Sequence, residues 1–122
     1  MKVLIADDNP QMRALLRRLC ATVATETRDC ADGHEAIRAF SEFKPDWTVM
    51  DLTMPHLGGL AATQQIVAAY PHARIVMITQ CRGVEYEQAA REAGACALLH
   101  KENLQSLLSL LSVPPNRCKT SS

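Results

Sequence analysis

Short apolar runs recur along the chain, separated by longer segments in which the apolar positions have helical spacing. The runs are rich in β-branched residues and do not alternate between apolar and polar positions, which is typical of strands buried on both faces of a sheet. They lie at Val3–Ala6, Trp47–Met50, Ile75–Ile78 and Ala97–Leu99. A polar, β-permissive stretch at Thr25–Cys30 predicts a fifth strand at an edge of the sheet.

The segments between these runs show the periodicity of amphipathic helices. After Asn9 as a cap and Pro10 as the first helical residue, apolar side chains recur at i, i+3, i+4, i+7 and i+8 and share one side of the predicted helix. These residues are Met12, Leu15, Leu16, Leu19 and Cys20. Further helices are predicted at about 33–43, 59–69, 84–93 and 102–111. The first two of these end before prolines and the third ends before Gly94, which are common helix terminators.

This alternation of strands and helices predicts the fold class. Strands separated by helices pair in parallel through right-handed crossovers, and the helices then cover both faces of the sheet. We therefore expect a doubly wound α/β domain over residues 1–112. The proline-broken, polar residues 113–122 are typical of a linker or a frayed end.

The composition and charge of the chain argue against several classes of function. The 122 residues suffice for one domain, and 13 basic residues balance 13 acidic ones, which argues against attraction of the whole surface to nucleic acid or to anionic lipid. The apolar run at the N-terminus is too short for a signal peptide, and no stretch is long enough to span a membrane. Five cysteines without a CxxC pair favour reduced thiols. We expect a cytoplasmic protein.

Polar residues follow the predicted strands where a ligand would bind. Asp7 and Asp8 follow the first strand, and Asp51 ends the third. Thr79 ends the fourth strand and Lys101 comes just after the fifth. Because ligands of open parallel sheets bind beyond the carboxyl ends of the strands, these groups are expected to converge at one edge.

Three carboxylates at one edge repel each other unless a cation is bound or a pKa is raised. Mg²⁺ prefers oxygen ligands and binds through one or two carboxylates together with phosphate oxygens. With the cluster neutralised, one carboxylate can act as a nucleophile towards a phosphoryl group, and the lysine and the hydroxyl can contact the phosphoryl oxygens. The pattern therefore predicts magnesium-dependent phosphoryl chemistry, with Mn²⁺ as an alternative ion.

At this point the chain resembles the response-regulator receiver domains of two-component signalling. The matching segments are Val3–Asn9, Asp32–Ala36, Pro45-Asp46, Met50–Pro55, Gly58–Leu60, Val76–Thr79, Ala93–Ala95 and Leu99–Lys101. The chain has the sequence Asp51-Leu52-Thr53-Met54-Pro55, and no proline follows Lys101. In both features it is similar to receivers that precede a helix-turn-helix DNA-binding domain. The resemblance implies a flavodoxin-like sheet with the strand order 2-1-3-4-5.

The resemblance also implies a role for each candidate site residue. Asp51 would accept a phosphoryl group from the phosphohistidine of a sensor histidine kinase, and Thr79 and Lys101 would sense it. The implied magnesium ligands are the carboxylates of Asp7, Asp8 and Asp51 and the backbone carbonyl of Thr53. Such a domain is not an enzyme with turnover, since it catalyses only its own phosphorylation and dephosphorylation.

Partners are implied in the same way. The face formed by the fourth helix, the fifth strand and the fifth helix would bind a second copy of the chain or a downstream effector. We expect no direct nucleic-acid binding by these residues and no membrane binding, although a DNA-binding domain can follow in a longer chain.

Two other functions stay open. The family usually has tyrosine or phenylalanine where this chain has Leu98, and a small residue where it has Gln80. These departures favour a receiver fold retained for docking without phosphorylation. An aspartate-nucleophile phosphatase is disfavoured, because Thr53 stands where such enzymes usually have a second aspartate.

Overall fold

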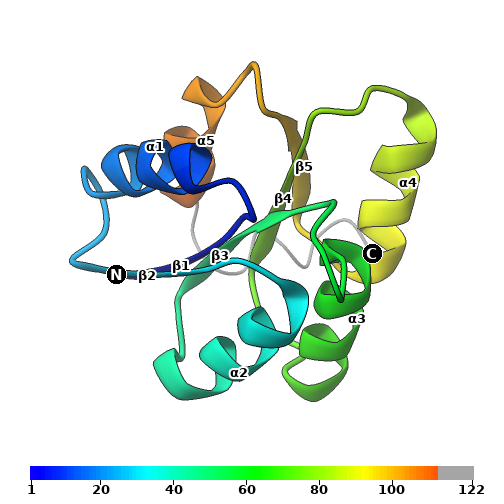
Figure 1. Ribbon diagram of the computed structural model, residues 1–122, viewed down its shortest axis with the longest axis horizontal. Helices are drawn as coiled ribbons and strands as arrows, with labels where there is room; N and C mark the ends of the chain where they lie inside the picture. The colour runs from blue at the N-terminus through cyan, green and yellow to red at the C-terminus, as the bar shows by residue number, and fades with distance from the viewer. Residues whose placement is uncertain (113–122) are drawn as a thin grey trace.

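Five parallel strands form one sheet in the structure, a computed structural model that describes residues 1–112. The strands are β1 (Lys2–Ala6), β2 (Glu26–Cys30), β3 (Trp47–Asp51), β4 (Ile75–Thr79) and β5 (Ala97–His100). Their order is β2-β1-β3-β4-β5, and each neighbouring pair is parallel (Figure 1). The predicted doubly wound fold and its strand order are confirmed, including the edge position of β2. The predicted tail at 113–122 lies outside the described residues.

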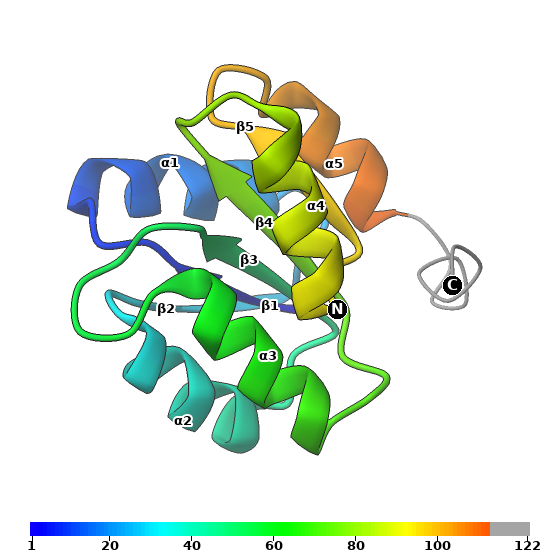
Figure 2. The same cartoon turned by 90° about the vertical axis from the view of Figure 1, so that its right-hand side faces the viewer.

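Helices cover both faces of this sheet. They are α1 (Pro10–Cys20), α2 (Gly33–Phe43), α3 (Gly59–Ala69), α4 (Val84–Ala93) and α5 (Gln105–Leu111). Figure 2 shows α1 and α5 on one face and α2, α3 and α4 on the other. Because successive strand side chains point to opposite faces, Ile5 packs with Leu16 and Leu107, whereas Leu4 packs with Phe40 in the second core. Both faces of the central strands are therefore buried, as their continuous apolar runs predict.

The helix termini follow local signals in the sequence. The side chain of Asn9 accepts a hydrogen bond from the Met12 N–H at 2.9 Å, and Pro10 is the first residue of α1. Gly94 ends α4 with a φ of 104°, a conformation that favours glycine. Gly59 begins α3 against the end of β3, and a Cβ atom there would lie 2.0 Å from the Asp51 carbonyl oxygen. Glycine at this position lets α3 start directly beside Asp51.

Two details of the helix prediction are wrong. The last helix begins at Gln105 rather than Glu102, because the backbone N–H groups of Glu102 and Asn103 are bound to His100 in a turn. Leu15 was expected on the buried side of α1, but 36% of its surface is exposed. The side of α1 that is buried against the sheet is therefore narrower than the apolar pattern suggests.

The thiols differ in their state. Cys20, Cys30 and Cys81 are free, as expected. Cys96 is disulfide-bonded, so the expectation of a reduced thiol is wrong at that position. Cys118 lies outside the described residues.

Across residues 1–112, no helix combines the length and the apolar character needed to cross a membrane.

Candidate functional site

The carboxyl edge of the sheet holds the polar residues that the sequence places after the strands. Asp7 follows β1, Asp51 ends β3 and Thr79 ends β4. Lys101 follows β5 directly. Asp7, Asp51 and Thr79 are buried, whereas Asp8 is exposed. Four strands thus contribute side chains to one end of the fold, as the topology requires of parallel strands.

Lys101 lies between two buried carboxylates. Its Nζ atom is 3.0 Å from Asp7 Oδ2 and 3.3 Å from Asp51 Oδ2. Its side chain is only 9% exposed, so water screens these ion pairs weakly. Burial acts to lower the pKa of Lys101, but hydrogen bonding and the charges of both carboxylates raise it above the ordinary value. Lys101 is therefore a permanent cation at the centre of the site.

Asp51 has an unusually basic carboxylate. Burial, and next the negative charge of Asp7, raise its pKa from 3.8 to about 6, against the opposing effects of Lys101 and of the Thr53 N–H. The Thr53 nitrogen lies 3.4 Å from Asp51 Oδ1. At pH 7 the carboxylate is still mainly ionised, which is the form that attacks an electrophile.

The carboxylates of Asp7, Asp8 and Asp51 form an acidic cluster that fits a divalent cation. One oxygen atom from each can be chosen so that all three lie within 4.8 Å of one another. The three negative charges exceed the single positive charge of Lys101. Asp7 Oδ2 is buried and, apart from that ion pair, accepts no hydrogen bond within the described residues. Hard ions such as Mg²⁺ and Mn²⁺ prefer this oxygen donor set.

Two threonines complete the predicted set. The Thr79 hydroxyl oxygen accepts a hydrogen bond from the Cys81 N–H at 2.9 Å, which leaves its hydrogen free to donate. Thr53 is exposed, two residues beyond Asp51, and holds the Asp51 carboxylate through its N–H as described above. The predicted role of its carbonyl as a metal ligand stays a prediction.

The comparisons with known proteins agree with this geometry. A family model described as the response regulator receiver domain matches residues 3–112. The chain belongs to the response-regulator receiver family. Among relatives, this receiver is 36% identical over 104 residues to the uncharacterized transcriptional regulatory protein YhcZ of Bacillus subtilis, covering 84% of this chain and 49% of the relative. It is 30% identical over 105 residues to the response regulator GacA of Pseudomonas aeruginosa, covering 83% and 48%.

A solved structure extends the likeness to three dimensions. It is a LuxR-family two-component response regulator from Aurantimonas sp. SI85-9A1, with a TM-score of 0.81 and 34% identity over 91% of this receiver and 84% of that chain. The receiver spans about half the length of the curated relatives it matches. These relatives are named as a response regulator and as a transcriptional regulatory protein, and receiver domains are regulatory units.

One side chain of the receiver that sequence reasoning did not assign to the site is His100. Its Nε2 lies 2.9 Å from the Gln80 carbonyl oxygen, and its Nδ1 accepts the Glu102 N–H at 3.1 Å. Both contacts are satisfied by the neutral tautomer with hydrogen on Nε2. Beside it, Arg82 pairs with Glu102 at 2.6 Å. These contacts tie the loop after β4 to the loop after β5, and no sequence signal reveals them because two of the partners are backbone atoms.

The unusual position 98 of this receiver also has a structural counterpart. Leu98 and Thr79 both line a cavity of about 180 Å³ between the β4 end, the following loop and β5. A leucine fills less of this space than the aromatic side chain that the resemblance leads one to expect. Any movement of Thr79 therefore has room without the displacement of a ring.

Proposed function

We propose that this receiver is a phosphorylation-controlled switch of a two-component phosphorelay, in which Asp51 accepts a phosphoryl group from a sensor histidine kinase. The observation that carries the proposal is the arrangement of Lys101 between Asp7 and Asp51, at 3.0 and 3.3 Å, beside the acidic cluster. A lysine that only stabilised the fold would not require two buried carboxylates and a third beside them. The arrangement suits a site that holds a cation and a phosphoryl group together.

The chemistry follows from the groups in place. An Asp51 oxygen attacks the phosphorus atom, and an O–P bond forms as the P–N bond to the donor histidine breaks. Lys101 donates to the phosphoryl oxygens as negative charge develops, and the free hydrogen of the Thr79 hydroxyl gives a second donor. Asp7, Asp8, Asp51 and the Thr53 carbonyl would hold the ion, and bound Mg²⁺ or Mn²⁺ would neutralise the carboxylates and the incoming phosphoryl oxygens.

The output of the proposed switch is a change of contacts. We assign residues 1–112 to the receiver and propose that it binds a second copy or an effector through α4, β5 and α5. GacA is named a response regulator and YhcZ a transcriptional regulatory protein, and both are about twice as long as the matched region. By analogy, we propose transcriptional regulation in the cytoplasm as the output that the switch controls. The receiver itself performs no turnover beyond its own phosphorylation and dephosphorylation.

Intact-mass spectrometry after incubation with acetyl phosphate tests this function. A magnesium-dependent adduct of one phosphoryl group is expected on the wild-type chain and is expected to be absent from Asp51→Ala. Asp46→Ala is the matched control, because Asp46 is an exposed aspartate at the opposite edge of the sheet, where it accepts the Lys2 N–H. An adduct that persists in Asp51→Ala would contradict the assignment of the acceptor.

A second candidate function is docking without phosphorylation. Leu98 and Gln80 favour it, because the first leaves the cavity near Thr79 without a ring and the second places a larger polar side chain after Thr79. This function would be favoured over the switch if the chain formed no adduct and bound no Mg²⁺, and if wild type and Asp51→Ala bound a partner equally well.

A further inference from the structure

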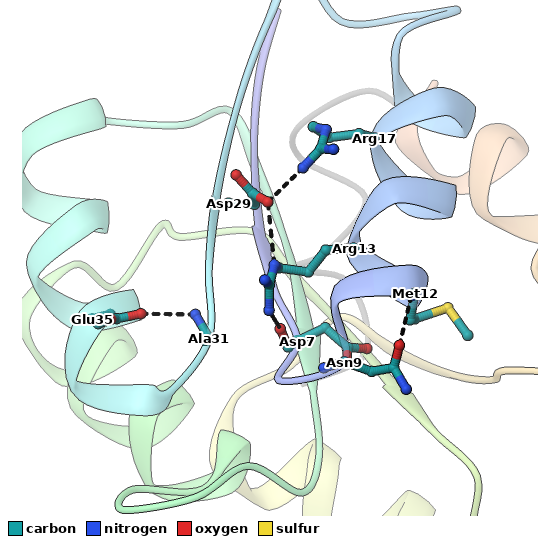
Figure 3. A network of polar contacts seen from close by, with 8 residues as sticks. All are labelled: Asp7, Asn9, Met12, Arg13, Arg17, Asp29, Ala31 and Glu35. Atoms are coloured by element: carbon teal, nitrogen blue, oxygen red, sulfur yellow. Dashed lines mark hydrogen bonds and ion pairs between the residues drawn. The ribbon is translucent and has the colours of Figure 1, made fainter.

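The side chain of Arg13 links the acidic cluster to the edge strand. From α1, its Nη1 atom donates to the Asp7 carbonyl oxygen at 2.8 Å, and its Nε atom lies 3.3 Å from Asp29 Oδ2 on β2 (Figure 3). Arg17, one turn further along α1, contacts the same Asp29 oxygen at 2.6 Å. Within residues 1–112, no hydrogen bond or ion pair joins Arg17 to Asp7. Only one of the two arginines therefore reaches the site.

Every polar atom of Asp7 has a defined partner. Its N–H donates to the β2 backbone at 3.0 Å, and its Oδ1 accepts the Asn9 N–H at 2.8 Å. Its Oδ2 faces Lys101, and its carbonyl is held by Arg13. The Asp7 carbonyl belongs to the same planar peptide group as the Asp8 N–H. A donor fixed on that carbonyl therefore fixes the orientation of the peptide that joins the two adjacent carboxylates.

We propose that Arg13 is a positioning residue for divalent-cation binding: held by Asp29, it sets the Asp7–Asp8 peptide so that both carboxylates face the ion. The inference rests on the metal site of the proposed function. A guanidinium suits this task because its planar fork donates in two directions at once, to a carbonyl and to a carboxylate. With a side chain 22% exposed, Arg13 is also partly shielded from competing water.

The sign of the effect separates positioning from charge. A guanidinium repels a nearby cation, so by Coulomb's law its removal strengthens Mg²⁺ binding. Loss of the carbonyl contact has the opposite effect, because the Asp7–Asp8 peptide can then rotate and the carboxylates must be reordered when the ion binds. Weaker binding after removal of a positive charge is therefore a result that charge alone does not produce.

Two methionine variants make this comparison. Arg13→Met and Arg17→Met each remove one positive charge and one Asp29 contact from α1 and keep an unbranched stem, but only Arg13→Met removes the contact with Asp7. Mg²⁺ is titrated into the full chain by calorimetry. We expect Arg13→Met to bind about 10-fold more weakly than wild type, at the lower end for groups that orient metal ligands, and Arg17→Met to bind equally or more tightly.

A readout without metal accompanies the titration. In EDTA, the ¹⁵N shift of the Asp8 amide is expected to move in Arg13→Met and to stay in place in Arg17→Met. Arg13→Lys keeps the charge but not the two-way fork, and its Mg²⁺ affinity is expected to fall between those of wild type and Arg13→Met. This variant also supplies the test if Arg13→Met does not fold.

The outcomes are distinct. If wild type binds Mg²⁺ and the folded Arg13 variants bind it equally or more tightly, the positioning role is overturned and the proposed function stays intact. No Mg²⁺ binding by wild type would overturn the metal site of the proposed function itself, and this inference with it.

Discussion

Replacing Asp51 with asparagine is expected to stabilise the metal-free fold at neutral pH. The change removes one negative charge beside buried Asp7 and leaves Lys101 paired with Asp7 alone, so the excess negative charge of the acidic cluster falls by one. The shape of the side chain is nearly unchanged. Asp51→Asn therefore removes the repulsion that Asp51 adds to the acidic cluster, with little change in packing.

The magnitude follows from the pKa of Asp51. Its rise from 3.8 to about 6, caused chiefly by burial, corresponds to about 3 kcal/mol against the ionised form in the folded state. An asparagine side chain also loses hydration when it is buried, so we expect Asp51→Asn to gain about 1–3 kcal/mol at pH 7.5. A raised carboxylate pKa destabilises the folded protein above that pKa. The destabilisation is relieved as the pH falls from 7 towards 4.

Urea unfolding in EDTA at pH 7.5 and pH 5 measures this effect. The advantage of Asp51→Asn over wild type should fall by about half between pH 7.5 and pH 5, with an unchanged m-value. Asp46→Asn, at the exposed opposite edge, is the control and should show no such pH-dependent gain. A variant less stable than wild type at pH 7.5, or an advantage independent of pH, would refute the argument. Saturating Mg²⁺ should stabilise wild type more than Asp51→Asn. The ion binds only the folded state, and the variant lacks one of the three carboxylates of the acidic cluster.

Three further results are expected. Gly59→Ala should destabilise the fold by at least about 2 kcal/mol in urea unfolding, because its Cβ would clash with the last β3 carbonyl, whereas little change would show that α3 can shift. His100→Leu should cost about 0.5–1.5 kcal/mol and speed amide exchange in the loop after β4, because the exposed Gln80 carbonyl exchanges its protein partner for water. Unchanged exchange would count against this link. Burial, followed by nearby acidic charges, raises the pKa of the Cys30 thiol to about 12. Mass mapping after iodoacetamide treatment at pH 8 should therefore find the exposed Cys81 alkylated before Cys30. Equal alkylation rates at the two cysteines would contradict this.

The sequence predicts the fold well because each local signal agrees with the tertiary arrangement. Continuous apolar strands require cover on both faces, and Asn9, Pro10 and Gly94 mark helix ends that the structure keeps. The start of α5 could not be predicted in this way. The apolar pattern says nothing of the turn after β5, in which Glu102 binds the His100 ring.

The site is predictable in its members but not in its contacts. The strand-end rule brings Asp7, Asp51 and Lys101 to one edge, yet the position of the lysine between the carboxylates depends on the packing of β5. Arg13 was not predicted, because a basic residue on a partly exposed helix face looks like any solvated charge. Its significance depends on the position of Asp29 on a strand that is distant along the chain.

The place of Lys101 on the last strand also sets an order of events during synthesis. A nascent chain contains all three carboxylates of the acidic cluster as soon as Asp51 has been added, long before the codon for Lys101 is read. Until β5 docks against β4, Asp7 and Asp51 lack the cation that forms an ion pair with both of their carboxylates. Completion of the site is therefore a late step of maturation, and a ribosome-bound fragment that lacks β5 has the acceptor carboxylate without its counter-ion.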